Sequence, residues 1–258
     1  MGTYGSGVRT VRNGARVDRP SVGRGDTETG NQLLDALPPA ERERIVAHAR
    51  PRWTSAGEVL FDAGRRADAV WFPVSAVVSI LTVLEDGSGV EIATIGREGV
   101  VGVFVFLGDD RSPNGRAVVQ MAGEVLEVDA DAFRSELGES GKLGGVLQDY
   151  TRALLLQVSQ SVACSAAHPV RARLARWLLQ TTDRVRSDDI RLTQQFLSEI
   201  LHTRRASITE AVGALEAAGA VRRRRGAITV SDREALEYAA CECYAIVRRE
   251  YARLVPGE

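Results

Sequence analysis

Two adjacent arginines, Arg204 and Arg205, stand at the start of a predicted helix, and a run of four more follows at residues 222–225. Guanidinium groups bind phosphates, and in the major groove they can donate two hydrogen bonds to a guanine edge. The start of a helix adds free backbone N–H groups and the positive end of the helix dipole, which both favour an anion. The chemistry that these residues predict is contact with a nucleic acid.

The elements that position these arginines follow from the segment LTQQFLSEILHTRRASITEAVGAL, residues 192–215. Thr193 is a favourable N-cap for a first helix. Leu192 and Leu197 occupy the two positions of a hydrophobic staple around that cap. A turn at residues 202–203 then leads into the second helix, so the segment predicts a helix-turn-helix.

The second helix is predicted over residues 204–218, with Gly219 where a left-handed C-terminal cap is favoured. Its buried face is predicted from helical spacing: Ile208, Ala211, Val212 and Leu215. The residues predicted to contact DNA lie on or beside the other face: Arg204, Arg205, Ala206, Ser207, Thr209 and Glu210. Glu210 repels phosphate but can accept a hydrogen bond from cytosine N4, which argues against a merely nonspecific basic surface.

The sequence VRRRRGAITV predicts a hairpin that turns at Arg225-Gly226. Four arginines in such a hairpin have little packing use but suit a wing that contacts phosphates. The predicted DNA-binding set is completed by the first N-cap and the wing: Thr193, Arg222, Arg223, Arg224 and Arg225. The alternative is an ordinary helical bundle with a solvated basic face, which the wing and the staple disfavour.

The charge distribution supports separate tasks for the two halves of the 258-residue chain. Residues 33–140 contain 18 acidic and 10 basic side chains, a net charge of −8. Residues 171–231 contain 12 arginines and 6 acidic side chains, a net charge of +6. An acidic first half and a basic second half indicate a polyanion as the partner of the second.

Several classes of protein are disfavoured by what the sequence lacks. It has no apolar run of membrane-spanning length and no signal peptide, so a cytoplasmic protein without membrane contact is expected. Three cysteines do not make a disulfide framework, and no two of the three histidines have ligand spacing, so no metal site is predicted. The β-rich segment has no histidine, and no nucleophile has an obvious histidine nearby, so no enzyme is predicted.

The first half is predicted to be a small β-roll. Residues 1–30 are rich in Gly, Arg, Ser and Thr and are expected to be a disordered tail, and residues 31–140 are expected to form the roll domain. Within that domain VVSILTVL and VEIATI flank a hairpin turn at Asp86-Gly87, and AVVQMAGEVLEV suggests a further strand pair around Gly123. Two short helices are expected before the first strand, the second over residues 41–50.

A helix of about 25 residues is predicted over residues 141–168. Its apolar stripe is narrow, which favours packing on a partner helix, although packing on its own domain is the alternative. The expected dimer contacts are Leu147, Tyr150, Leu154, Val158 and Val162. Residues 166–169 are the expected hinge, because Pro169 ends or kinks the helix. Residues 169–254 form the DNA-binding domain, closed by one final helix after a capping box at residues 231–234.

The order of β-roll, long helix, helix-turn-helix and wing resembles the Crp/Fnr family of bacterial transcription regulators, over roughly residues 30–245. The strongest part of the resemblance runs from LTQQFLSEILHTRRAS to ALEYAACECY. It implies an α+β fold in which residues 31–140 are a cyclic-nucleotide-binding-like sensor domain. It also implies a homodimer paired through the long helix and a two-fold operator in double-stranded DNA. It further implies RNA polymerase as a partner. Ala206 departs from the family pattern, so the operator sequence does not carry over.

The resemblance also places an effector pocket. Its candidate residues are Gly96, Glu98, Gly99, Arg111, Ser112 and Ser159. Pro113 removes a donor from the phosphate-binding segment, and only the serine remains of the family's Thr-Ser pair, so a regulator that does not use cyclic AMP is predicted. The alternatives are a response to cyclic AMP or cyclic GMP and, less favoured, a redox response through Cys164.

No cofactor is expected, because the N-terminal half lacks the cysteines that hold an iron–sulfur cluster in the Fnr branch. Cys241 and Cys243 are expected to be buried structural thiols that face different ways on one helix.

Overall fold

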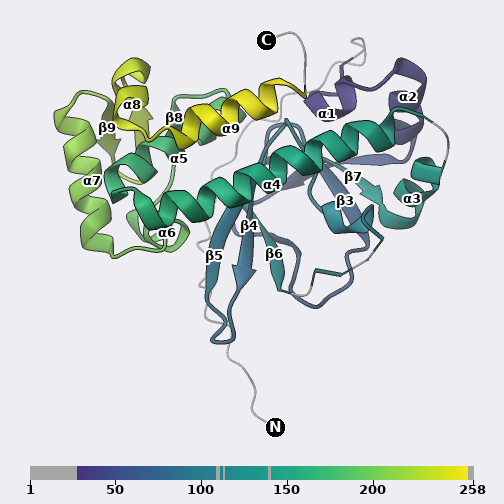
Figure 1. The fold of residues 1–258 in the computed structure, drawn as a ribbon, viewed down its shortest axis with the longest axis horizontal. Coiled ribbons are helices and arrows are strands. Elements are labelled where there is room, and N and C mark those ends of the chain that lie inside the picture. The colour runs from purple at the N-terminus through teal and green to yellow at the C-terminus, as the bar shows by residue number, and fades with distance from the viewer. Residues whose placement is uncertain (1–27, 109–110, 113, 139–140, 255–258) are drawn as a thin grey trace.

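The computed structural model describes residues 28–108, 111–112, 114–138 and 141–254. Most of the disordered tail expected at residues 1–30 therefore lies outside the described residues. Figure 1 shows a β domain and a mostly helical domain, with the long helix α4 (Leu143–Ala167) extending from one to the other. None of the helices in the described ranges combines the length and the apolar character that crossing a membrane requires.

The first domain is a β-roll built from two antiparallel sheets, in the orders β1-β7-β3 and β2-β6-β4-β5. The strands are β1 Ala49–Thr54, β2 Val59–Phe61, β3 Ala69–Pro73, β4 Val77–Val83, β5 Gly89–Ile95, β6 Gly115–Met121 and β7 Gly123–Asp129. The predicted hairpin is β4–β5, and Gly87 at its turn has a φ of 81°, which glycine adopts without strain.

Both strands predicted around Gly123 are present, but the prediction that they pair with each other is wrong. β6 and β7 follow each other directly, but they belong to different sheets. The chain passes between the sheets at Gly123, where a Cβ atom would lie 2.4 Å from the backbone nitrogen of Ala76. Glycine therefore permits a close backbone approach here, and alternation of side chains alone did not distinguish this crossing from a tight hairpin.

Helices cover one end of the roll. They are α1 Gln32–Asp35, α2 Pro39–Ala47 and α3 Ala130–Gly138, and a short 3₁₀ turn η1 lies at Val103–Val105. Helix α2 ends before the predicted residue 50, because Ala49 and Arg50 already pair with β7 as part of β1. Asn31 caps α1 by accepting a hydrogen bond from the backbone N–H of Leu34.

The long helix α4 joins the core of the roll through its first half. Leu143, Leu147, Tyr150 and Leu154 are buried in the same apolar cluster as the inner faces of the two sheets. The expected apolar stripe is thus present, but its first half packs on its own domain. His168 follows α4 in an extended conformation, as expected for a residue before proline.

The second domain has its own apolar cluster. Its elements are α5 Val170–Val185, β8 Asp189–Arg191, α6 Gln194–Ile200, α7 Arg205–Ala217, β9 Val221–Arg224, β10 Ala227–Val230, α8 Arg233–Ala239 and α9 Cys243–Ala252. α6 and α7 are the predicted helix pair, and β8 adds an unpredicted third strand to the wing in the order β8-β10-β9. Gly219 has a φ of 75° and ends α7 as predicted.

The single final helix predicted for this domain is wrong, because the structure has α8 and α9 with a break at residues 240–242. Its cap is also displaced by one residue: Asp232, and not Ser231, accepts the hydrogen bond at the start of α8. The break turns α9 so that it lies along α4 (Figure 1). Val247 and Tyr251 of α9 join the apolar core of the roll, so tertiary packing determines this part of the chain.

Candidate nucleic-acid interface and the contacts behind it

Helix α7 exposes the polar face that the sequence predicts. Its apolar side, formed by Ile208, Ala211, Val212 and Leu215, is buried in the core of the second domain. Arg204, Arg205, Ala206, Thr209 and Glu210 are exposed, and Ser207 is half-buried. Arg204 is the N-cap of α7 and makes no side-chain capping bond. The backbone N–H groups of the first turn therefore lack a capping side chain at the end where an anion is favoured.

The helix before α7 sets its position. Thr193 caps α6 by accepting a hydrogen bond from the N–H of Phe196 at 3.1 Å. Gln194 lies next to α7, because its Oε1 accepts from the Thr209 hydroxyl at 3.2 Å. The turn between the helices passes through His202, whose φ of 44° is left-handed. This turn presents the N-terminus of α7 outward.

The wing is an antiparallel hairpin beside α7, and Gly226 has the positive φ of 72° that its turn requires. All four arginines from Arg222 to Arg225 are exposed. Arg223 pairs with Glu216 of α7, with 3.4 Å between Nη2 and Oε2. Because strand side chains alternate, Arg222 and Arg224 project from the opposite face of β9. Three wing arginines therefore have guanidinium groups available for phosphates.

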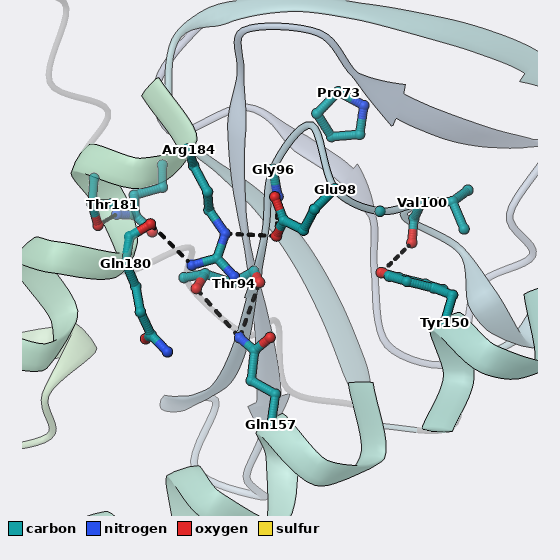
Figure 2. Close-up of polar contacts among 12 residues, drawn as sticks. Pro73, Thr94, Gly96, Glu98, Val100, Tyr150, Gln157, Gln180, Thr181 and Arg184 are labelled. Carbon is teal, nitrogen blue, oxygen red and sulfur yellow. Dashed lines mark hydrogen bonds and ion pairs between the residues drawn. The ribbon is translucent and has the colours of Figure 1, made fainter. Parts of the chain in front are cut away.

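The loop expected to bind an effector contacts the second domain. Figure 2 shows Arg184 of α5 pointing at Glu98. Arg184 Nε donates to Glu98 Oε1 at 2.7 Å, and both side chains are largely buried, at 7% and 13% exposure. Burial alone would lower the pKa of Arg184, but the Glu98 carboxylate holds that pKa above its ordinary value. The carboxylate of Glu98, one of the candidate effector residues, is thus engaged in an ion pair between domains.

The two glycines of this loop have a packing role in this arrangement. A Cβ atom on Gly96 would lie 2.6 Å from Cγ of Arg184, so glycine lets the arginine approach. A Cβ atom on Gly99 would lie 2.5 Å from Cε2 of Tyr150. That tyrosine donates a hydrogen bond to the carbonyl of Val100 at 2.9 Å (Figure 2). The loop is therefore held by α5 on one side and by α4 on the other.

The other candidate effector residues have different neighbours. Arg111 is exposed and pairs with Arg66 in an isolated β-bridge. Ser112 accepts a hydrogen bond from the N–H of Gly115 at 3.0 Å. Ser159 is exposed on α4. Glu98 is therefore the candidate whose position depends most directly on the second domain.

The residues expected at the dimer seam divide into two sets. Leu147, Tyr150 and Leu154 are buried in the chain's own core. Val158 is half-buried, and Val162 is 61% exposed. Leu155, which is absent from the predicted stripe, is 63% exposed. Leu155 and Val162 lie two helical turns apart on the same side of α4, so the exposed apolar surface of this helix keeps Val162 of the expected stripe and adds Leu155.

A cleft of about 240 Å³ lies between β5, α4, α5 and the turn after α6. Gln157, Arg176 and Gln180 line it, and each has a buried side-chain atom without a hydrogen-bond partner in the described part of the chain. Glu91 of β5 also lines it and accepts a hydrogen bond from Ser79 at 2.6 Å. Burial raises the pKa of Glu91 to about 7. The sequence did not indicate this site because its residues come from four separate elements.

The three cysteines lie together, contrary to the expectation that Cys241 and Cys243 face different ways on one helix. Cys241 precedes α9, and Cys243 is its first residue. Cys164 Sγ lies 3.5 Å from Cys241 Sγ, and Cys243 Sγ lies 3.5 Å from Nδ1 of His168. All three are free thiols. The hydrogen bond with Cys241 lowers the pKa of Cys164.

The ion pair between the domains can be tested by a double-mutant cycle. Arg184→Ala is expected to lower the free energy of unfolding by about 3 kcal/mol, because it leaves the Glu98 carboxylate buried without its partner. Glu98→Gln in the Arg184→Ala background should recover part of that loss. Arg171→Ala, at an exposed position of the same helix, is the control and should change stability by less than about 0.5 kcal/mol. Additive effects of the two substitutions in chemical denaturation would show that the pair is not coupled.

Glu91→Gln tests the pKa of the cleft carboxyl. The folded protein holds the Glu91 proton more tightly than the unfolded chain, so the stability that this proton provides is present at acid pH and is lost as the pH rises through about 7. The variant should therefore be more stable than the wild type at pH 8, and the difference should disappear near pH 4. Equal melting temperatures of the two proteins at every pH would contradict the raised pKa.

Comparison with known proteins agrees with this architecture. The family model of the cyclic nucleotide-binding domain matches residues 51–140, and that of the Crp-like helix-turn-helix domain matches residues 172–239. The "Global nitrogen regulator" of Synechococcus elongatus is 24% identical over 189 residues, which are 70% of this chain and 85% of the relative.

Two solved structures illustrate the similarity of fold. FixK2 from Bradyrhizobium japonicum has a TM-score of 0.62 at 17% identity, covering 75% of this chain and 98% of that one. The regulator CLP of Xanthomonas campestris, described as c-di-GMP responsive, has a TM-score of 0.59 at 17% identity, covering 76% and 100%. Since the two family models together match more than half of the sequence, in the order seen in these structures, the chain belongs to the Crp/Fnr family of transcription regulators.

Proposed function

We propose that this regulator binds a two-fold DNA operator as a homodimer, with the N-terminus of α7 in the major groove of each half-site. The observation that carries the proposal is the exposed polar face of α7 beside three wing arginines without an ion-pair partner in the described part of the chain. A helix-turn-helix of this kind places the first turns of its second helix against base edges.

The exposed residues fall into two roles. Arg205 and Glu210 extend from the outer face of α7 and are suited to guanine and cytosine edges, respectively. Ser207 and Thr209 can donate to or accept from either kind of edge. Arg222, Arg224 and Arg225 on the wing would contact phosphates, which fix the position of the protein but carry no sequence information. Arg204 and Thr193, at the two helix starts, are further candidates for phosphate contact.

Dimerisation through α4 rests on its exposed apolar residues. Leu155 and Val162 form a surface at a spacing of seven residues, with Ser159 between them. A second copy of α4 would bury both, as in a short coiled coil. A dimer with its two α7 helices turned to one side would match half-sites one helical turn apart, and RNA polymerase would be its partner at the promoter, in the cytoplasm.

The sensor, in this proposal, does not respond to cyclic AMP. Glu98 is already paired with Arg184, and the space next to Gly96 is occupied by that arginine. A nucleotide at this loop would have to displace a buried ion pair before it could bind Glu98. The regulator CLP, which has a similar fold, is described as responsive to c-di-GMP.

Selection of bound sites from random duplex DNA tests the proposal, with and without cyclic AMP. The wild type should enrich a two-fold sequence, equally well in both conditions. Arg205→Ala should weaken binding to that sequence by about 1–3 kcal/mol and relax the preference at one position of each half-site. Replacing Arg222, Arg224 and Arg225 by Ala should weaken binding to every duplex and reduce the salt slope by about 1 for each phosphate that an arginine no longer neutralises.

Arg134→Ala, on helix α3 of the sensor, is the control and should change neither the base preference nor the salt slope. An unchanged base preference in Arg205→Ala would remove this residue from the base-contacting set. An unaltered salt slope in the triple variant would show that the wing arginines do not contact phosphates. Enrichment that depends on cyclic AMP would overturn the proposal for the sensor.

Leu155→Asp tests the dimer surface. The substitution places a charge at an exposed apolar position, so the chain should remain folded while the dimer dissociates. Light scattering should report a monomer, and circular dichroism an unchanged helix content. Leu147→Asp, in the core of the roll, should instead unfold the protein. A Leu155→Asp protein that stays dimeric would place the interface elsewhere.

A further inference from the structure

The cysteine and histidine side chains form a cluster where the two domains meet. Cys164 and His168 come from the end of α4 and the residue after it, one helical turn apart, while Cys241 and Cys243 flank the start of α9. One ligand atom from each of the four lies within 4.8 Å of every other. Three of them are thiols with at most 8% of their surface exposed.

Two of the distances among these atoms are close to those of a tetrahedral metal site, and all of them are at most 4.8 Å. Zinc–sulfur bonds of about 2.3 Å place the sulfur atoms of a tetrahedral site roughly 3.8 Å apart. The distance between the sulfurs of Cys164 and Cys241 and the distance between Cys243 Sγ and His168 Nδ1 are both 3.5 Å. A disulfide would instead need sulfur atoms about 2 Å apart and would use only two of the four groups.

The surroundings of the cluster have the features of an outer ligand shell. His168 turns Nδ1 toward Cys243, and its Nε2 lies 3.3 Å from Oε2 of Glu242. A carboxylate on the distal nitrogen of a ligating histidine fixes the orientation of the ring and increases its basicity. Gln160 donates a hydrogen bond to Cys243 Sγ at 3.1 Å, as an amide does to a bound thiolate.

Charge and access also suit a cation with thiolate ligands. Three thiolates and a neutral imidazole around a divalent ion carry a net charge of −1. Arg173 and Arg176 of α5 interact electrostatically with Cys164 and offset that charge. His168 keeps 21% of its side chain exposed, so the site can be reached from solvent.

From this geometry we infer that Cys164, His168, Cys241 and Cys243 bind one zinc ion as a structural Cys₃His site. The ion ties the end of α4 to the start of α9 across the hinge at Pro169. Its chemical role is structural, because four protein ligands leave no open position for a substrate. The site accounts for the break between α8 and α9, which brings Cys241 to Cys164.

The test uses the full-length protein, reduced and then freed of loosely bound metal. Elemental analysis of protein loaded with Zn²⁺ should give about one zinc per chain. Titration with Co²⁺ should give intense thiolate-to-cobalt charge-transfer bands and the visible bands of tetrahedral cobalt, saturating at one equivalent. Protein that binds neither ion tightly, or binds cobalt only with the weak spectrum of an octahedral ion, would overturn the inference.

Variants then assign the ligands. Cys164→Ser and Cys241→Ser should lose the charge-transfer bands or weaken them strongly. Glu242→Gln, which alters only the outer carboxylate, should keep the spectrum and bind zinc about tenfold more weakly. His48→Ala, remote from the cluster, is the control and should match the wild type. If the cysteine variants fail to fold, the cobalt titration of the wild type and of Glu242→Gln still shows whether the cluster binds a tetrahedral metal ion. Zinc affinity that stays unchanged in both cysteine variants would contradict the assignment.

Discussion

The packing of α4 against both domains is the constraint on which the rest of the structure depends. Its first half is buried in the core of the β-roll through Leu147 and Tyr150. Its second half contacts the DNA-binding domain through Gln160 and Cys164, while α9 returns along it. Because one helix is shared in this way, the second domain cannot turn relative to the roll without breaking specific contacts. The position of α7, and hence of its arginines, is thereby linked to the β-roll.

The contacts that hold the second domain differ in kind. The pair between Arg184 and Glu98 is buried and directional, so its geometry specifies one arrangement of the domains even where its net contribution to stability is small. The cleft beside it contains three buried polar atoms without partners in the described part of the chain, which costs free energy in this arrangement. An interface that combines one specific ion pair with unsatisfied polar groups is suited to having a second arrangement of similar free energy.

The features that the sequence predicted well are local in the chain. The cap at Thr193, the left-handed Gly219, the turn at Gly226 and the two faces of α7 each depend on residues within one or two turns. What it failed to predict depends on distant partners. Arg184 and Glu98 are 86 residues apart, and Cys164 and Cys241 are 77 apart. Cys164 and His168 are four residues apart at the end of a helix, which was a local signal for the cluster. The prediction of no metal site compared histidines only with one another, so it did not include this cysteine–histidine pair.

The same distinction explains why only part of the stripe predicted on α4 is exposed. The periodicity of α4 showed that the helix has an apolar stripe but not which structure covers it, since the roll and a second helix both bury apolar side chains. Only the fold shows that Leu147, Tyr150 and Leu154 face the roll, leaving Leu155 and Val162 on the open side. A partner on that side would lie along the helix that also contributes Leu147 and Tyr150 to the core of the roll and Cys164 to the cysteine cluster. Contact with the roll, contact with the second domain and the proposed dimer surface therefore all lie on one element, so a shift of α4 by a fraction of a turn would alter all three together.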